Sequence, residues 1–417
     1  MRHLMPSHCE VPDGWSLPGN LYFKNQIVKM EERLSIAPMM EWTDAHYRMF
    51  MRGLTKKTVL YTEMVVDDTI IHGPGLDFFV GKYIEEQPSI IQVGGHDPEK
   101  LGKAAEICEQ YGAGYGEINL NCGCPSPRVA KRCFGAKLML EPDHVREIVY
   151  TMQRHVSIPV SVKCRIGADD LDSYDDLTNF IRSANAGGAK KFIIHARKCL
   201  LNGLSPKQNR EIPPLRYEVV HKLVQDFPEL QFVINGGIQS LEQAKSHVNE
   251  RYNHTFIEEN DNTTTTTSSL PPVHGVMLGR VAFNNPVIFA TADSELYGVK
   301  DPCLTRRQVL ERYIDYCEWC QSQDGPRYTV KDDKLLTVST SVLLNAMRNI
   351  MHGLPNNQRF RTALNDVYME KIRGINGTPN PSCRDVVSYL FILLLLYECS
   401  FLICSINCIL ITFEFKK

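Results

Sequence analysis

Short runs of apolar and β-branched residues recur along the middle of the chain, each bounded by turn-forming or charged residues. Runs of this kind predict buried β-strands. They read LSIAPM, VLYTEM, SIIQVGG, GEINLN, IPVSVKCRIG, KFIIHAR, QFVINGG and HGVMLGR, at residues 34–39, 59–64, 89–95, 116–121, 158–167, 191–197, 231–237 and 274–280. The sequence therefore predicts eight strands.

Most of these runs are separated by stretches with the apolar spacing of an amphipathic helix, as at residues 97–113, 141–156 and 175–189. Strands that alternate with helices of this length form parallel βαβ units. Eight such units predict an α/β protein with a closed (β/α)8 TIM barrel, here over residues 33–300, because a doubly wound sheet would show fewer units.

The regions around the predicted barrel have different patterns. Residues 1–32 precede the first strand as an N-terminal extension. Apolar residues at three- and four-residue spacing predict a small helical domain over residues 301–376. The polar, threonine-rich stretch at about 249–272 predicts a disordered surface insertion without chemistry.

Residues 377–417 are interpreted as a linker and an apolar tail, which is almost wholly apolar from Tyr389 to Phe413. About 20 such residues suffice to span a bilayer. Glu398 near the middle would cost about 2.5–3.5 kcal/mol there. Three interpretations stay open: a membrane anchor, which would give the protein its membrane contact, a buried helix, or a segment absent from the mature protein.

The 46 basic and 48 acidic residues give a net charge of −2, which argues against a protein that coats nucleic acid indiscriminately. Any nucleic-acid surface must therefore be local. The N-terminus resembles neither a secretory signal nor a transit peptide, so the 14 cysteines are expected to be reduced. We expect a monomer in the cytoplasm or an organelle, and the sequence does not decide between these compartments.

Each predicted strand ends in groups able to bind or react, and in a barrel these carboxyl ends form one mouth where catalysis is placed. The glycines of INGG and LGR, from the last two strands, predict a phosphate site. The chain has no G-x-G-x-x-G after a strand, so a mononucleotide such as FMN fits better than a dinucleotide. Lys163 would then lie near the isoalloxazine edge.

Three cysteines, Cys122, Cys124 and Cys133, lie close together within residues 117–140. Their C-x-C-x8-C spacing lacks the paired C-x2-C modules of structural zinc sites, and no nearby histidine completes four ligands. We therefore predict no metal. Cys317 and Cys320 form a C-x-x-C in a helical stretch and are interpreted as packing residues.

Several motifs occur in the order known from one enzyme family: SIAPMMEWTDAHYR, YTEM, IQVGG, EINLNCGCPSPRV, FGAKLM, VSVKCRIGADDLDSYDDL, IIHARKCLLNGLSPKQNREIPPL, INGGIQSLEQAK and GVMLGR. From about Leu34 to Gly298 the chain resembles the tRNA-dihydrouridine synthases, most closely the A branch, which acts at U20 and U20a of the D-loop. The resemblance implies an FMN-dependent reduction, by NADPH, of the C5–C6 bond of a uridine in tRNA.

The resemblance also implies site residues. Cys124 is similar to the family's thiol that protonates C5 of uracil, a role that suits a thiol of pKa about 8.5. Asn121 and Arg165 resemble the residues that hold the uracil, and Lys207, Asn209 and Arg210 match the substrate-binding signature. FMN contacts are implied at Pro38, Met39, Gln92, Lys163, His195, Asn235, Gly236, Gly237, Gly279 and Arg280. The family usually has no cysteine at position 122, and Lys137 stands where the A branch often has one, so neither position is expected to be catalytic.

Basic side chains near the predicted mouth form an expected rim for RNA: Arg128, Lys131, Arg132, Arg197 and Lys198. In the helical domain, Arg359 and Arg361 resemble residues that reach the RNA. A uridine must leave its stack to reach a flavin in a barrel, so we predict extrusion of the base. Two alternatives stay open: an FMN-dependent dehydrogenase of a free pyrimidine, and a non-catalytic RNA-binding module.

Overall fold

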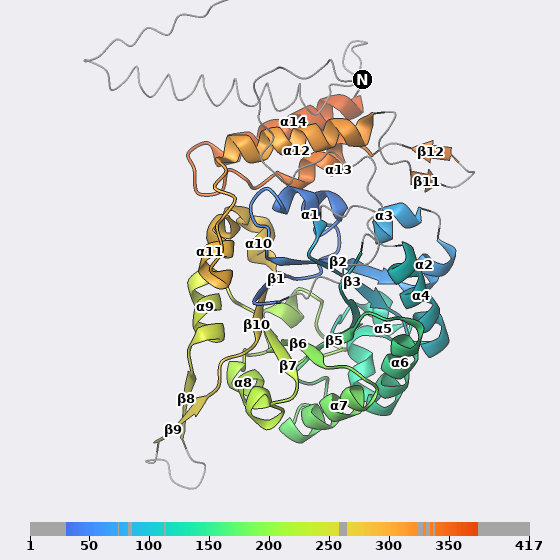
Figure 1. The fold of residues 1–417 in the computed structure, drawn as a ribbon, viewed down its shortest axis with the longest axis vertical. Helices are drawn as coiled ribbons and strands as arrows, with labels where there is room; N and C mark the ends of the chain where they lie inside the picture. The colour runs from blue at the N-terminus through green and yellow to red at the C-terminus, as the bar shows by residue number, and fades with distance from the viewer. Residues whose placement is uncertain are drawn as a thin grey trace, which may run out of the picture.

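The computed structural model describes residues 31–73, 75–81, 86–111, 114–257, 265–322, 328–330, 334–336 and 338–373. Eight parallel strands close into a barrel in the order β1-β10-β7-β6-β5-β4-β3-β2 (Figure 1). Their bounds are β1 Leu34–Ile36, β2 Val59–Val66, β3 Ser89–Gly94, β4 Ile118–Cys122, β5 Val160–Arg165, β6 Lys191–His195, β7 Gln231–Asn235 and β10 Gly275–Leu278. The predicted TIM barrel and its eight strands are confirmed.

Helices follow the strands and surround the barrel (Figure 1). The sequence begins some of them with side-chain caps: Ser173 and Asp176 form a capping box at α7, and Ser240 accepts from the Gln243 amide at α9. The bounds are α1 Ala45–Met51, α2 Asp67–His72, α3 Leu76–Val80, α4 Pro98–Tyr111, α5 Pro127–Ala130, η2 Gly135–Leu140, α6 Pro142–His155, α7 Tyr174–Ala186, η3 Gln208–Arg210, α8 Tyr217–Asp226, α9 Leu241–Asn249, α10 Arg280–Asn284, η4 Pro286–Thr291 and α11 Ala292–Tyr297.

Strand side chains alternate between the helix layer and the barrel interior. The inward apolar residues form their own buried cluster, separate from the larger core between strands and helices: Ala37, Val59, Tyr61, Ile90, Ile193, Val233 and Met277. Polar residues fill much of the interior on β3, β4 and β5, where Gln92, Asn119 and Ser161 are buried and bonded to one another in sequence. One side of the barrel interior is therefore apolar and the other polar.

The amino end of the barrel is closed by a buried ionic cluster. The Lys191 ammonium lies 2.6 Å from Glu32 Oε2 and 2.6 Å from Glu117 Oε2. The Tyr61 hydroxyl donates to Glu32 Oε2 at 3.1 Å. We call these four residues the amino-end cluster.

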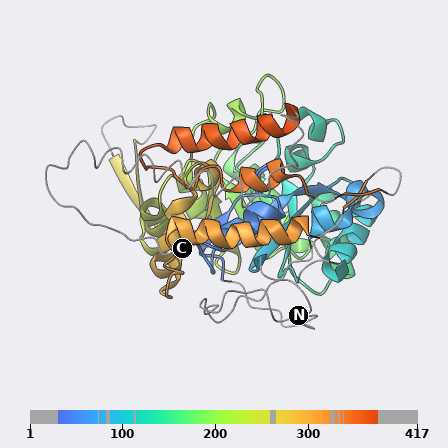
Figure 2. The ribbon, with the colours of Figure 1, turned by 90° about the horizontal axis from the view of Figure 1, so that it is seen from above.

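A helical unit lies beside the barrel and packs against the outer helix α1, near α10 (Figures 1 and 2). It comprises α12 Arg306–Gln321, α13 Thr340–Ala346 and α14 Asn357–Arg373, so helices do follow the barrel as predicted. It is joined to α1 by a bond of 2.9 Å between His46 Nδ1 and Tyr316 Oη, and to α10 by Asn349 Nδ2, which donates to the Phe283 carbonyl at 2.8 Å. The unit also contains a short hairpin that the sequence did not predict, β11 Tyr328–Val330 and β12 Lys334–Leu336. Cys317 and Cys320 are fully buried in α12.

The predicted disordered insertion is partly wrong. Within it, β8 Tyr252–Ile257 pairs antiparallel with β9 Thr265–Leu270. Threonine is β-branched and favours strands, so this polar, low-complexity stretch forms a hairpin although its composition predicted disorder. Because the hairpin lies between α9 and β10, it leaves the barrel at the amino end, and Figure 1 shows it projecting away from the helical unit. The hairpin therefore lies at the amino end of the barrel, opposite the mouth.

Among the described residues, no helix has the length and apolar character needed to cross a membrane. Most of the predicted N-terminal extension and the whole apolar tail lie outside the described residues.

Candidate active site

Cys124 lies in the loop after β4, at the carboxyl end of the barrel. The loop is held from two sides: Cys124 N donates to Asn121 Oδ1 at 2.9 Å, and the Cys124 carbonyl accepts from Ala136 N at 3.0 Å. Gly135 is in the left-handed region (φ 70°), and a Cβ there would stand 2.7 Å from the Cys124 carbonyl oxygen. Glycine is therefore needed at position 135 to let the backbone there lie against the Cys124 carbonyl.

The thiol is partly buried and protonated at neutral pH. Burial raises the pKa of Cys124, and a backbone hydrogen bond from Ser126 and the charges of Arg165 and Lys163 oppose this rise. A protonated thiol beside cations can give up its proton and have the resulting thiolate stabilised.

The other two clustered cysteines occupy different environments. Cys122 is fully buried on the outward face of β4, in register with Cys164 on β5. Cys133 Sγ accepts from Lys137 Nζ at 3.2 Å. In the part of the chain that the structure describes, no group of three or more histidine, cysteine or carboxylate side chains is arranged to hold a metal.

Lys163 and His195 line the interior at neighbouring positions on β5 and β6. Lys163 Nζ donates to Asn235 Oδ1 at 3.3 Å, a neutral acceptor, and Asn235 is fixed by its own bond of 2.8 Å to the Met277 carbonyl. Burial, together with the charge of Arg165, lowers the pKa of Lys163 to about 8. Burial and the positive charges of Arg165 and Lys163 hold the pKa of His195 well below its usual range, so its imidazole is neutral at pH 7. The strand ends thus present a weakly held ammonium beside a neutral imidazole.

Glycines follow the last two barrel strands, β7 and β10, and their surroundings differ. Gly236 and Gly237 have φ of 118° and 71°, and a Cβ on Gly236 would lie 2.7 Å from His195 Cδ2. At Gly279 an added Cβ would meet no atom within 4 Å, so its backbone borders open space. Pro38 and Met39 follow β1, where Met39 N donates to Thr43 Oγ1 at 3.0 Å. This is the kind of glycine cradle that admits a phosphate.

Arg280 is exposed and forms an ion pair with Glu211, with 2.8 Å between Nη1 and Oε1. No sequence signal predicts this partner, because the two residues are 69 positions apart. Arg197 donates to the carbonyls of Pro213 and Glu211 and thereby braces the same loop.

Two residues predicted to contact the substrate, Asn209 and Arg165, make buried contacts within the protein. Asn209 is fully buried, and its amide bonds to Leu200 N at 2.8 Å and to the Leu200 carbonyl at 2.9 Å. Arg165 is also buried, and its guanidinium donates to three backbone carbonyls, those of Gly123, Lys198 and Asn209, at 3.0–3.1 Å. The Asn209 side chain thus closes its own loop, and its contact with substrate stays a prediction. Arg165 joins that loop to the loop of Cys124.

The other predicted basic residues differ in availability. Lys198 forms an ion pair with Asp172, with 2.7 Å between Nζ and Oδ2, so its ammonium is less available to RNA. Lys207 and Arg210 are exposed beside the loop of Asn209. Exposed side chains also occur at Arg128, Lys131 and Arg132 after β4 and at Arg359 and Arg361 on α14.

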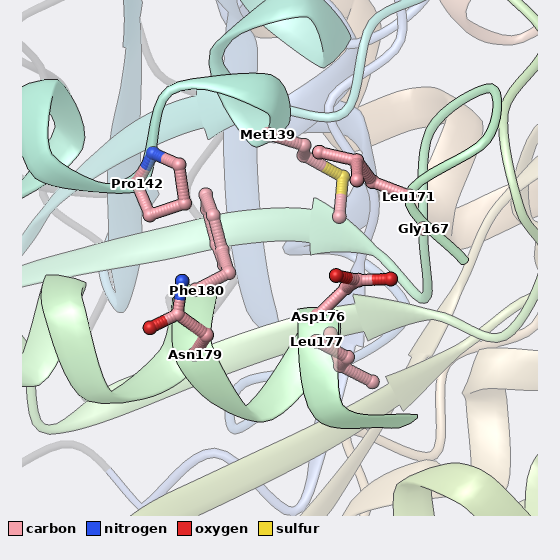
Figure 3. Close-up of a pocket in the computed structure, with 8 residues that line it drawn as sticks. All are labelled: Met139, Pro142, Gly167, Leu171, Asp176, Leu177, Asn179 and Phe180. Atoms are coloured by element: carbon pink, nitrogen blue, oxygen red, sulfur yellow. The ribbon is translucent and has the colours of Figure 1, made fainter. Parts of the chain in front are cut away.

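A small cavity of about 30 Å³ lies outside the barrel, between the β4–α6 connection and α7 (Figure 3). Met139, Pro142, Asp176 and Phe180 are among its lining residues. Its volume is about that needed for one water molecule, so it is not a nucleobase or flavin site.

The model of the dihydrouridine synthase family matches residues 35–256. The tRNA-dihydrouridine(20/20a) synthase of Vibrio parahaemolyticus is 46% identical over 287 residues, which cover 69% of this chain and 80% of the relative. The enzyme of the same name from Pseudomonas aeruginosa is 40% identical over 346 residues, covering 82% and 92%. Among solved structures, a 2-naphthoyl-CoA reductase complex matches with TM-score 0.42 and 11% identity, over 62% of this chain and 49% of that one.

Proposed function

The chain belongs to the dihydrouridine synthase family, and from that premise we propose that it reduces the C5–C6 double bond of uridine 20 or 20a in the tRNA D-loop. The observation that carries the proposal is the placement of Cys124. Asn121 holds the Cys124 backbone N–H at the carboxyl end of the barrel, and the protonated thiol lies within the electrostatic influence of Lys163 and Arg165.

The residues of the barrel mouth fit a flavin mononucleotide. The backbone at Gly279 after β10 leaves room for a phosphate, and Arg280 supplies a cation beside it. The proposed flavin contacts are Pro38, Met39, Gln92, Lys163, His195, Asn235, Gly236, Gly237, Gly279 and Arg280. When bound, FMN supplies the hydride that adds to C6 of the uracil, with NADPH as the proposed reductant.

Cys124 then completes the reaction as general acid. Addition of hydride at C6 leaves negative charge on C5 and the C4 carbonyl. The S–H bond of Cys124 breaks, a C–H bond forms at C5, and the electron pair stays on sulfur as a thiolate. Lys163 and Arg165 stabilise that thiolate, since their charges favour ionisation of the Cys124 thiol.

The tRNA is held by exposed basic side chains around the mouth, with Lys207 and Arg210 nearest to the target uridine. This local surface lets a chain of net charge −2 bind RNA. The uridine reaches Cys124 only when it is turned out of its stack, so we propose that the enzyme binds an extruded base.

The test is mass mapping of dihydrouridine in tRNA from cells that lack the protein. Wild type should restore dihydrouridine at the D-loop, and Cys124→Ala should not, with activity of the purified variant lower by about 10²–10⁴-fold. The purified wild type should be yellow and should oxidise NADPH when given tRNA without dihydrouridine. Turnover of free uridine or orotate but not tRNA would favour a free-pyrimidine dehydrogenase, and a protein that binds tRNA without flavin would be a non-catalytic module.

A further inference from the structure

A continuous chain of side-chain hydrogen bonds crosses the barrel interior beneath the loop of Cys124. Asn121 Nδ2 donates to Gln92 Oε1 at 2.8 Å, Gln92 Nε2 donates to Asn119 Oδ1 at 2.8 Å, and Asn119 Nδ2 donates to Ser161 Oγ at 2.7 Å. All four side chains are buried, and they come from β3, β4 and β5. We call this set the amide relay.

The direction of every bond in the relay is fixed at its upper end. The backbone N–H groups of Gly123 and Cys124 point at one end of the Asn121 amide, at 3.1 Å and 2.9 Å. An N–H can only donate, so that end must be the oxygen. The Asn121 nitrogen must then face Gln92 Oε1, and Gln92 must in turn donate to Asn119.

The lower end of the relay lies near the amino-end cluster. Ser161 Oγ accepts from Asn119, and the Ser161 hydroxyl is one of the neighbours that oppose the rise in the pKa of the buried Glu117 carboxylate. Glu117 is held by Lys191. Bonds that all run in one direction polarise one another, and each donor in the relay is strengthened by the next.

This direction determines what a ligand meets at the mouth. A side-chain amide has one oxygen with two lone pairs and two N–H groups. Both lone pairs of Asn121 Oδ1 are taken by backbone N–H groups, and one N–H is taken by Gln92, so one N–H remains. Gln92 likewise keeps one N–H. At Asn121 the relay therefore presents a donor and no free acceptor, which matches a ring carbonyl of uracil and opposes the C4 amino group of cytosine.

We propose that Asn119 and Ser161 are positioning residues, which hold Gln92 and Asn121 as hydrogen-bond donors toward a pyrimidine carbonyl and hold the Cys124 loop in place. The identity of the ligand rests on the proposed function. The effect on the Cys124 loop does not, and it can be measured without flavin or tRNA.

The test compares Ser161→Ala with Ser35→Ala. Ser35 is an equally buried serine on β1, and its hydroxyl has no hydrogen-bond partner within the described residues, so its loss removes no bond. Each protein is treated with iodoacetamide, and alkylation of Cys124 is followed by peptide mass spectrometry. Each is also assayed for kcat and KM on unmodified tRNA. Ser161→Thr, which keeps the hydroxyl, tests rescue.

We expect Ser161→Ala to raise the alkylation rate of Cys124 several-fold and to lower kcat/KM about tenfold, because a buried amide donor loses its acceptor. Ser35→Ala should match wild type in both measurements, and Ser161→Thr should return toward it. Equal behaviour of Ser161→Ala and Ser35→Ala would overturn the proposal. If wild type reduces no tRNA but Ser161→Ala still changes the alkylation rate, the relay stands and the proposed function fails.

Discussion

Two lysines on adjacent strands point into the same barrel, and the protein treats them in opposite ways. Lys191, on β6 at the amino end, contacts two carboxylates at 2.6 Å, and these partners raise its pKa despite burial. Lys163, on β5 at the carboxyl end, contacts a neutral amide at 3.3 Å, and burial lowers its pKa to about 8.

The difference separates a structural charge from a charge kept for a ligand. Desolvation of an ammonium is unfavourable, and at the amino end Glu32 and Glu117 offset it within the protein. Among the described residues no carboxylate pairs with Lys163 at the mouth, so its charge is available to an anionic ligand. A buried cation with a weak partner is thus a better sign of function than one with a strong partner.

The largest test of this comparison is Lys191→Met. Removing one member of a buried ionic group leaves the other charges uncompensated, so the free energy of unfolding should fall by about 3–5 kcal/mol. Urea denaturation measures it. Adding Glu117→Gln to Lys191→Met removes one of the two orphaned charges and should recover part of the loss. A loss below about 1 kcal/mol would mean that the amino-end cluster does not stabilise the barrel.

Lys163→Met should have the opposite effect on the flavin-free protein. It removes a poorly compensated charge, so the free energy of unfolding should rise by about 1–2 kcal/mol, while flavin binding and tRNA reduction are lost. Lys190→Met is the matched control: Lys190 also donates to an asparagine oxygen, at 2.8 Å, but it is exposed. The control should change neither the free energy of unfolding nor flavin binding and tRNA reduction. If Lys163→Met is less stable than wild type, then Lys163 stabilises the fold as Lys191 does, and the comparison fails.

The two lysines also predict different dependences on pH. Lys163 has a folded pKa of about 8, below the value of about 10.4 for an unfolded chain. Between these values the unfolded state binds more protons, so wild-type stability gains from Lys163 as pH rises. The excess stability of Lys163→Met over wild type should therefore shrink from pH 8 to pH 10. The contribution of Lys191, whose folded pKa is raised, should persist until pH passes the unfolded value. A gap independent of pH would contradict the assignment to Lys163.

The sequence predicted the barrel because its eight strands carry local signals of apolar run and turn, and the mouth followed from the topology. It did not predict how polar side chains pair across strands. A motif predicted that Asn209 binds substrate, but in the structure its side-chain amide hydrogen-bonds to the backbone of its own loop. Ser161 lies within the motif VSVKCRIGADDLDSYDDL but had no role assigned, and its part in the relay depends on the register between β4 and β5. The threonine-rich hairpin was missed because composition and strand propensity pointed to different answers.

The smallest effect is expected at the exposed ion pair of the mouth, Arg280 with Glu211. The hydrogen bond from Arg280 lowers the pKa of Glu211, so the carboxylate is charged and competes with a phosphate for Arg280. Glu211→Gln should leave the melting temperature unchanged, because exposed ion pairs contribute little, and should raise FMN affinity a few-fold in an assay by flavin fluorescence.

The gain in affinity for Glu211→Gln should shrink as salt is added, since exposed charges are screened. Glu218→Gln provides the control. It breaks a similar ion pair, in which Glu218 Oε1 lies 3.5 Å from Arg216 Nε, and Arg280 takes no part in that pair. If Glu211→Gln instead weakens FMN binding, then Glu211 orients Arg280 for the phosphate. In that case the mouth, like the amino end, would depend on a carboxylate of the protein, and the contrast between the two ends would hold for Lys163 but not for Arg280.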